Sequence, residues 1–151
     1  MAEKTKTEIG RIKKIDHIGI VVSDIKAATR VYEAILFKQP SYTEYVAEKK
    51  VDLVFFDIGE VQIELLAPRT SDSEIAFFLK NRGEGLHHIC YEVEGIGKIL
   101  ETLRKEGFKF IDEKPRPGSR NTQVFFVDSI STRGVYTEYC EFPNSYSNQN
   151  L

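Results

Sequence analysis

The sequence of 151 residues has few cysteines, no long apolar run and no excess of positive charge. Two cysteines, Cys90 and Cys140, are too few for the disulfide framework of a small secreted protein, so we expect a reducing cytoplasm. Apolar stretches fall short of the roughly 18 residues of a membrane span, and residues 1–14 lack the apolar core of a secretory signal. With a formal net charge of -2, neither nucleic acid nor a membrane is an expected partner.

The remaining composition is that of a globular protein. Hydrophobic residues make up 41% of the chain and charged residues 29%, which is ordinary for a domain that buries a core. A chain of this length suits one compact domain or two small, tightly joined halves.

The order of predicted elements repeats within the chain. The first half predicts a strand, a helix and three strands, at residues 15–22, 25–36, 42–46, 51–58 and 61–66. A short helix follows, and the second half predicts the same order at residues 86–93, 96–106, 108–112, 123–127 and 135–140. We therefore predict an α+β fold of two tandem βαβββ modules, with domain bounds 1–14 (flexible arm), 15–68 (first module), 69–85 (linker with a short helix), 86–143 (second module) and 144–151 (polar tail).

The repeat brings chemically unusual residues into equivalent positions. A shift of 71 residues places His17 on His88, and the last strands align at a shift of 74, which places Glu64 on Glu138. Each glutamate interrupts an otherwise apolar strand, where an unpaired carboxylate is costly and needs a partner, a proton or a metal ion. Two Glu–His ion pairs on strand surfaces are the simpler alternative.

If the first and last strands of each module are neighbours, one histidine and one glutamate converge in each module. Two modules that face each other would then bring His17, Glu64, His88 and Glu138 together. Two imidazoles and two carboxylates suit a divalent ion such as Zn, Co, Ni, Mn or Fe, with positions left open for water or substrate. A structural zinc site is normally closed and rich in cysteine, so the pattern favours Lewis-acid chemistry.

These residues lie in motifs that resemble the vicinal oxygen chelate (glyoxalase-fold) superfamily, and most closely its methylmalonyl-CoA epimerases. The resemblance covers essentially the whole of residues 15–141, and its matching segments are Asp16–Ile20, Ile63–Pro68, Phe78–Ile89, Ile111–Arg116 and Gly134–Glu138. The resemblance implies that the paired modules form a metal-holding cleft. It also implies one divalent ion (Co, Zn, Ni or Mn) held by His17, Glu64, His88 and Glu138, no further cofactor, and a small-molecule thioester as the substrate.

The resemblance also implies a reaction. Epimerases of this type invert a carbon that lies between a thioester and a carboxylate, which requires an acid/base group on each face of a planar intermediate. Glu138 or Glu64 could exchange the protons, and Asp52, set between Val51 and Leu53, is a candidate second base or a solvent-facing strand residue. His87 is not expected to bind the ion.

Local departures from the family pattern leave alternatives open. Where the family commonly has His-Pro-Lys-Ser before its last strand, this chain has Asp128, Ser129, Ile130 and Ser131. A glyoxalase I-type lactoylglutathione lyase uses the same ligands, and other members of the fold are non-catalytic small-molecule-binding modules. An extradiol dioxygenase is less favoured, because its iron is held by two histidines and one glutamate.

A homodimer is expected, because family members often pair through edge strands and Val54–Phe56 is an apolar run that would be exposed on such a strand.

Overall fold

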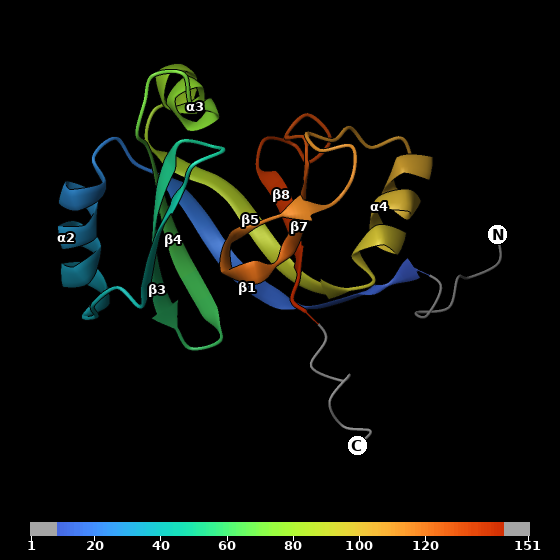
Figure 1. Cartoon of the computed structure of the whole chain (residues 1–151), viewed down its shortest axis with the longest axis horizontal. Coiled ribbons are helices and arrows are strands. Elements are labelled where there is room, and N and C mark those ends of the chain that lie inside the picture. Colours follow the sequence, from blue (N-terminus) through green and yellow to red (C-terminus); the bar gives the residue numbers. More distant parts are fainter. Residues whose placement is uncertain (1–8, 144–151) are drawn as a thin grey trace. The chain divides into compact units, whose positions relative to one another are not determined.

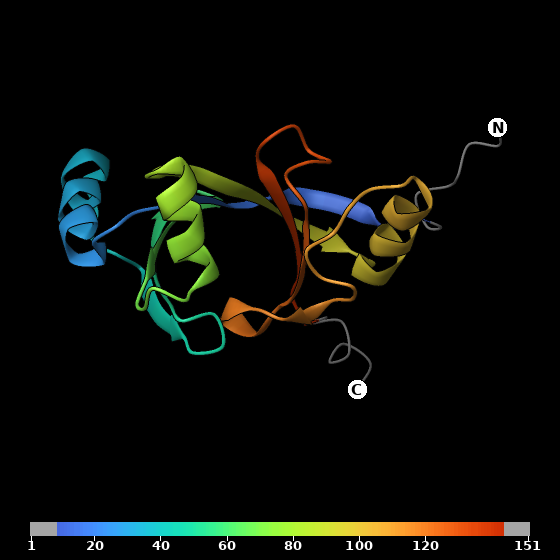
Figure 2. The same ribbon diagram turned by 90° about the horizontal axis from the view of Figure 1, so that it is seen from above.

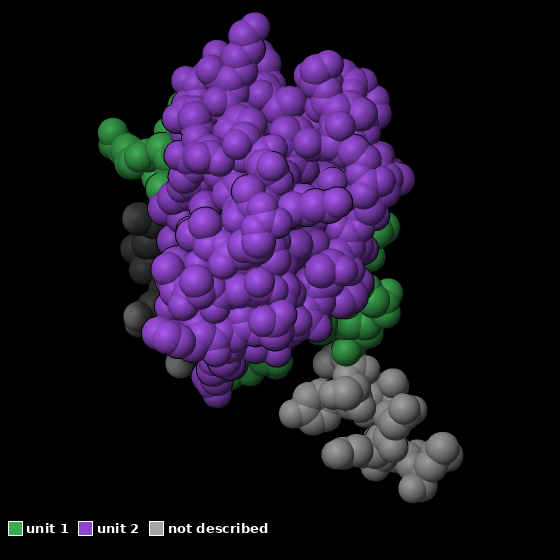
Figure 3. Space-filling model, turned by 90° about the vertical axis from the view of Figure 1, so that its left-hand side faces the viewer, with its two compact units in different colours: residues 1–14, 91–151 green, residues 15–90 purple. Residues whose placement is uncertain are grey.

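The computed structural model describes residues 9–143 (Figure 1). The chain divides into two compact units, residues 15–90 in one and residues 1–14 with 91–151 in the other, which Figure 3 distinguishes by colour. The unit of residues 15–90 contains the first predicted module, the linker and the beginning of the strand that opens the second module. The tail 144–151 and residues 1–8 of the predicted arm lie outside the described residues.

The first module has the predicted order of elements. They are β1 (Arg11–Val21), α2 (Ile25–Leu36), β2 (Tyr42–Val46), β3 (Val51–Ile58) and β4 (Val61–Pro68), followed by α3 (Glu74–Arg82). The strands lie in the order β2-β3-β4-β1-β5, where β5 is Gly85–Glu94. Strands β2, β3 and β4 pair antiparallel, whereas β1 and β4 are parallel. Strand β1 begins at Arg11, so residues 11–14 are strand and not part of a flexible arm.

Local signals set the bounds of these elements. Helix α2 begins where predicted because Asp24 Oδ1 accepts hydrogen bonds of 3.0 Å from the backbone N–H groups of Lys26 and Ala27. The hairpin between β3 and β4 turns at Gly59, whose φ of +62° suits a two-residue turn. No helix among residues 9–143 is long and apolar enough to cross a membrane.

The strand register gives this sheet two different faces. On one face, the core of Val22, Val54, Phe56, Leu65 and Ala67 packs against α2 (Figures 1 and 2). Alternate residues point to the other face, where Phe55 of β3 is opposite Glu64 of β4. Glu64 therefore lies on the face away from α2. The run Val54–Phe56 is buried, with at most 6% exposed, so the prediction that this run is exposed was wrong.

The second module repeats the order with shorter strands. Its elements are β5, α4 (Ile96–Lys105), β6 (Arg116–Pro117), a 3-10 turn (Ser119–Asn121), β7 (Gln123–Val127) and β8 (Tyr136–Glu141). Strand β7 pairs antiparallel with both β6 and β8. The core of this module is formed by three buried residues of α4 and three of the strands, namely Ile96, Ile99, Leu100, Val93, Phe125 and Val127. Both modules thus have the βαβββ order that the repeat predicts.

The predicted strand 108–112 does not form. Within this range the pairing with β7 is limited to a single bridge from Phe110 to Val127. The Asp112 carboxylate accepts hydrogen bonds from the backbone N–H of Phe126 at 2.9 Å and from Arg116 Nε at 2.8 Å. A side chain thus takes the N–H that a strand neighbour would need, and the two-residue β6 pairs with β7 instead.

Candidate metal centre

Three of the four predicted ligands meet on adjacent strands of one unit. His17 lies on β1, Glu64 on β4 and His88 on β5, in the strand order β4-β1-β5. The Nε2 atoms of His17 and His88 are 3.0 Å apart. Glu64 Oε2 lies 3.5 Å from His17 Nε2, and Glu64 Oε1 lies 3.5 Å from His88 Nε2. All three side chains are buried, with 1–4% of each residue exposed.

A glycine on the central strand makes this convergence sterically possible. Gly19 pairs with Glu64 in the parallel β1–β4 register. A Cβ at Gly19 would lie 2.1 Å from Cε1 and 2.4 Å from Nδ1 of His88, far inside van der Waals contact. The imidazole of His88 therefore occupies the space that any other residue at position 19 would fill.

The donor set fits a divalent metal ion. Ligand bonds of about 2.1 Å that meet at about 90–110° place neighbouring donor atoms about 3.0–3.4 Å apart. The separations of 3.0 and 3.5 Å among the three side chains agree with that geometry. Two imidazole nitrogens and a carboxylate oxygen are donors that suit a borderline divalent ion. The donors of a structural zinc site, by contrast, are usually rich in thiolate.

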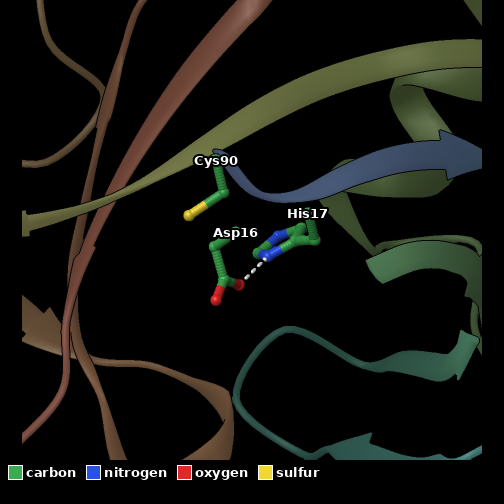
Figure 4. Close-up of side chains that lie close together, drawn as sticks. All are labelled: Asp16, His17 and Cys90. Carbon is green, nitrogen blue, oxygen red and sulfur yellow. Dashed lines mark hydrogen bonds and ion pairs between the residues drawn. The ribbon is translucent and has the colours of Figure 1, made fainter. Parts of the chain in front are cut away.

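The residue before each histidine contacts that histidine's other ring nitrogen. Asp16 Oδ2 lies 2.6 Å from His17 Nδ1 (Figure 4), and His87 Nδ1 lies 2.7 Å from His88 Nδ1. Asp16, His17 and the buried thiol of Cys90 also form a close group whose donor atoms lie within 4.8 Å of one another.

Glu138, the fourth predicted ligand, lies on β8 in the other unit. It is 8% exposed and opposite Phe126 of β7. Like Glu64, it is a buried carboxylate on the last strand of its module. Its role as a ligand stays a prediction.

Asp52 does not share a face with the three converging residues. It pairs across the sheet with Ala67, which belongs to the core under α2. Its carboxylate accepts hydrogen bonds from Arg69, with Asp52 Oδ2 3.2 Å from Nε, and the Arg69 guanidinium lies 3.5 Å from the ring centroid of Tyr45. This hydrogen bond raises the pKa of Arg69. An ion-paired carboxylate on the opposite face is unsuited to proton exchange beside Glu64.

Sequence reasoning missed a second carboxylate, Glu44 of β2. Glu44 pairs with Leu53, two residues from Phe55, so its side chain belongs to the same face as Glu64. Its Oε2 is buried, and no described residue donates a hydrogen bond to it. On this face, Phe55 lies between His17 and Tyr42, with ring centroids 5.9 and 5.8 Å away. Only the strand register reveals Glu44, because polar residues on edge strands are common.

Comparisons with known proteins agree with this fold. Residues 16–126 match the family described as the Glyoxalase/Bleomycin resistance protein/Dioxygenase superfamily. The chain is 34% identical to the mitochondrial methylmalonyl-CoA epimerase of Homo sapiens, over 86% of this chain and 74% of that protein. It is 38% identical to the uncharacterized protein YqjC of Bacillus subtilis, over 86% and 93% of the two chains.

A solved structure gives the same result. A Streptomyces coelicolor methylmalonyl-CoA epimerase variant in complex with 2-nitronate-propionyl-CoA matches with a TM-score of 0.82 and 29% identity, over 87% of this chain and 96% of that chain. The chain therefore belongs to the glyoxalase/bleomycin resistance protein/dioxygenase superfamily, and the predicted α+β glyoxalase fold is confirmed. Within that superfamily it is an isomerase of the methylmalonyl-CoA epimerase-like kind.

Proposed function

We propose that the protein is a metal-dependent epimerase that removes and returns the α-proton of an acyl-CoA thioester such as methylmalonyl-CoA. The observation that carries the proposal is the convergence of His17, Glu64 and His88 within 3.5 Å on one buried sheet face. The similarity to methylmalonyl-CoA epimerases of several organisms, and to one in complex with methylmalonyl-CoA and NH4+, supports it.

His17, Glu64 and His88 would hold one divalent ion, Co, Zn, Ni or Mn, with Glu138 as the fourth ligand. The place of Glu138 rests on the internal repeat and on the family resemblance. When bound, such an ion polarises the thioester carbonyl and stabilises the negative charge that develops as the α-proton leaves.

Two carboxylates would exchange the protons. Inversion needs one acid/base group on each face of the planar intermediate. We assign one role to Glu138 and the other to Glu44, whose buried Oε2 has no hydrogen-bond donor among the described residues and is therefore free to accept a proton. Glu64 keeps the role of ligand. We assign no role to Asp52, because its pairing with Ala67 places it on the opposite sheet face, where Arg69 donates hydrogen bonds to its carboxylate.

A substrate panel tests the proposed reaction. Metal-loaded protein is incubated in D2O with methylmalonyl-CoA, with other acyl-CoA thioesters and with the hemithioacetal of glutathione, and NMR follows the α-protons and products. We expect deuterium at the α-carbon of a 2-substituted malonyl thioester, with inversion. Turnover of the glutathione adduct alone would indicate a lactoylglutathione lyase, and turnover of no compound would indicate a binding module.

A glutamine variant tests Glu138 as a base. We expect Glu138→Gln protein that is shown to carry metal to lose most α-proton exchange, because the carboxamide cannot accept the proton. A metal-loaded variant that exchanges the proton at the wild-type rate removes Glu138 from this role. The cytoplasmic location and the homodimer stay predictions from the sequence.

A further inference from the structure

The residues that precede the two histidines are equivalent in the internal repeat. Asp16 precedes His17, and His87 precedes His88, 71 residues later in both cases. Neighbouring residues of a flat strand point to opposite faces. Both preceding side chains nevertheless lie within hydrogen-bond distance of the following ring, at 2.6 and 2.7 Å. The same local arrangement thus occurs twice, with a carboxylate in one module and an imidazole in the other.

We propose that Asp16 and His87 are positioning residues that hold the rings of His17 and His88 with both Nε2 lone pairs directed at the ion. This inference rests on the proposed metal site. A neutral imidazole that binds an ion through Nε2 carries its proton on Nδ1. His17 Nδ1–H then donates to Asp16 Oδ2. His88 Nδ1–H donates to His87 Nδ1, which fixes the His87 proton on Nε2.

Packing holds each positioning residue in place. Asp16 is 5% exposed and lies beside the fully buried Cys90 (Figure 4). The ring of His87 packs edge-on against Phe78 of α3, with centroids 4.8 Å apart and planes at 78°. Helix α3, which lies in the linker between the modules, thereby supports the His88 side of the site.

Positions 16 and 87 differ in charge, so the two histidines that follow them should differ in their strength as metal ligands. A carboxylate that accepts the Nδ1–H makes its imidazole a stronger electron donor than a neutral acceptor does. His17 is therefore the stronger of the two imidazole ligands. Removal of Asp16 should weaken metal binding more than removal of His87.

The test measures metal affinity rather than activity. Metal-free full-length protein is titrated with Co2+ against a competing chelator, and the melting temperature of each metal-free variant reports its fold. We expect Asp16→Leu and His87→Phe to raise the Kd for Co2+ by about 10- to 100-fold, as loss of such hydrogen bonds does elsewhere. His87→Asn should restore affinity to near the wild-type value, because Asn Oδ1 replaces His87 Nδ1 as the acceptor. Asp52→Asn serves as the control, since its carboxylate lies on the other sheet face.

The outcomes separate this inference from the proposed function. Wild-type protein that binds no Co2+ overturns both. Wild-type protein that binds Co2+ no more tightly than His87→Phe and Asp16→Leu overturns only the positioning roles. A thiolate-to-cobalt absorption band that disappears in Cys90→Ala would also overturn them, because Asp16, His17 and Cys90 would then hold the ion themselves. Loss of affinity in His87→Phe, with recovery in His87→Asn and an unchanged melting temperature, supports the inference.

Discussion

Gly19 of β1 lies directly beneath the imidazole of His88 on β5, so closely that a Cβ on the glycine would be 2.1 Å from His88 Cε1. Gly19 is two residues beyond His17 on the same strand and pairs with Glu64 on the next. The absence of a side chain at position 19 is therefore what allows residues from three strands to converge. The φ of Gly19 is not in the left-handed region, so its role here is spatial.

Gly19→Ala should displace the His88 ring and damage the metal centre. The methyl group overpacks a closed site, which typically lowers the free energy of unfolding by about 1–3 kcal/mol. The displaced Nε2 should raise the Kd for Co2+ by at least about tenfold, as measured by chelator competition. Unchanged affinity would show that the His88 ring can lie elsewhere without loss of the ion.

Gly97→Ala is the matched control for this variant. Gly97 lies in α4, and a Cβ there would meet no atom within 4 Å. Alanine favours a helix over glycine, so this change should raise the free energy of unfolding by about 0.5 kcal/mol and leave the Kd for Co2+ unaltered.

Much of the fold could be predicted because its signals are local. The Asp24 cap and the apolar positions after it predict α2 at its observed bounds, and Gly59 predicts the β3–β4 turn. The prediction of a strand at residues 108–112 was wrong, because the side chain of Asp112 accepts the hydrogen bond from the backbone N–H of Phe126. No pattern of apolar residues reveals that competition.

The candidate site was predictable only in part, for a similar reason. His17, Glu64 and His88 stand out because charged or polar residues repeat inside apolar strands. Glu44 and Asp52 look alike in the sequence, since each is an acidic residue in a strand. Only the register separates them, because it places Glu44 opposite Leu53 and Asp52 opposite Ala67, on different faces.

Glu44→Gln should reduce catalysis without loss of stability. Loss of a general base typically slows proton transfer by about 10²- to 10⁴-fold. The substituted side chain keeps the shape of Glu44, so the free energy of unfolding should not fall. The rate of α-proton exchange in D2O, measured at saturating metal, checks this expectation.

Glu48→Gln provides the control, because Glu48 is exposed in the turn that follows β2. The Glu48→Gln protein should exchange the α-proton of the substrate at the wild-type rate. If Glu44→Gln and Glu48→Gln are equally active, Glu44 is not the second acid/base group.

The N-terminus of α3 should loosen in acid. The hydrogen bond from Lys50, with a second from Thr70, lowers the pKa of Asp72 from 3.8 to about 2. A pKa that is lower in the folded state stabilises the fold above about pH 4, and this contribution disappears as the pH falls through about 2. Asp72 directly precedes Ser73, whose hydroxyl caps α3 by accepting from the N–H of Ile75 at 3.2 Å.

Lys50→Met tests the cause of this shift. NMR titration of the carboxyl carbon should show the pKa of Asp72 rising from about 2 towards 3.8 in the variant. Lys49→Met should leave it at about 2, because Lys49 pairs instead with Glu74. The same low pKa of Asp72 in both variants would mean that Lys50 is not the cause.

Metal-dependent epimerisation is tested most directly by α-proton exchange of methylmalonyl-CoA in D2O. NMR follows the exchange with metal-free protein, with Co2+ added back, and with a His17→Ala variant. We expect exchange and inversion only for the wild-type protein with metal, and almost none for the variant or for metal-free protein. Exchange that proceeds at full rate without a metal ion, or in His17→Ala, would contradict the assignment of His17, Glu64, His88 and Glu138 as the centre of a metal-dependent epimerase.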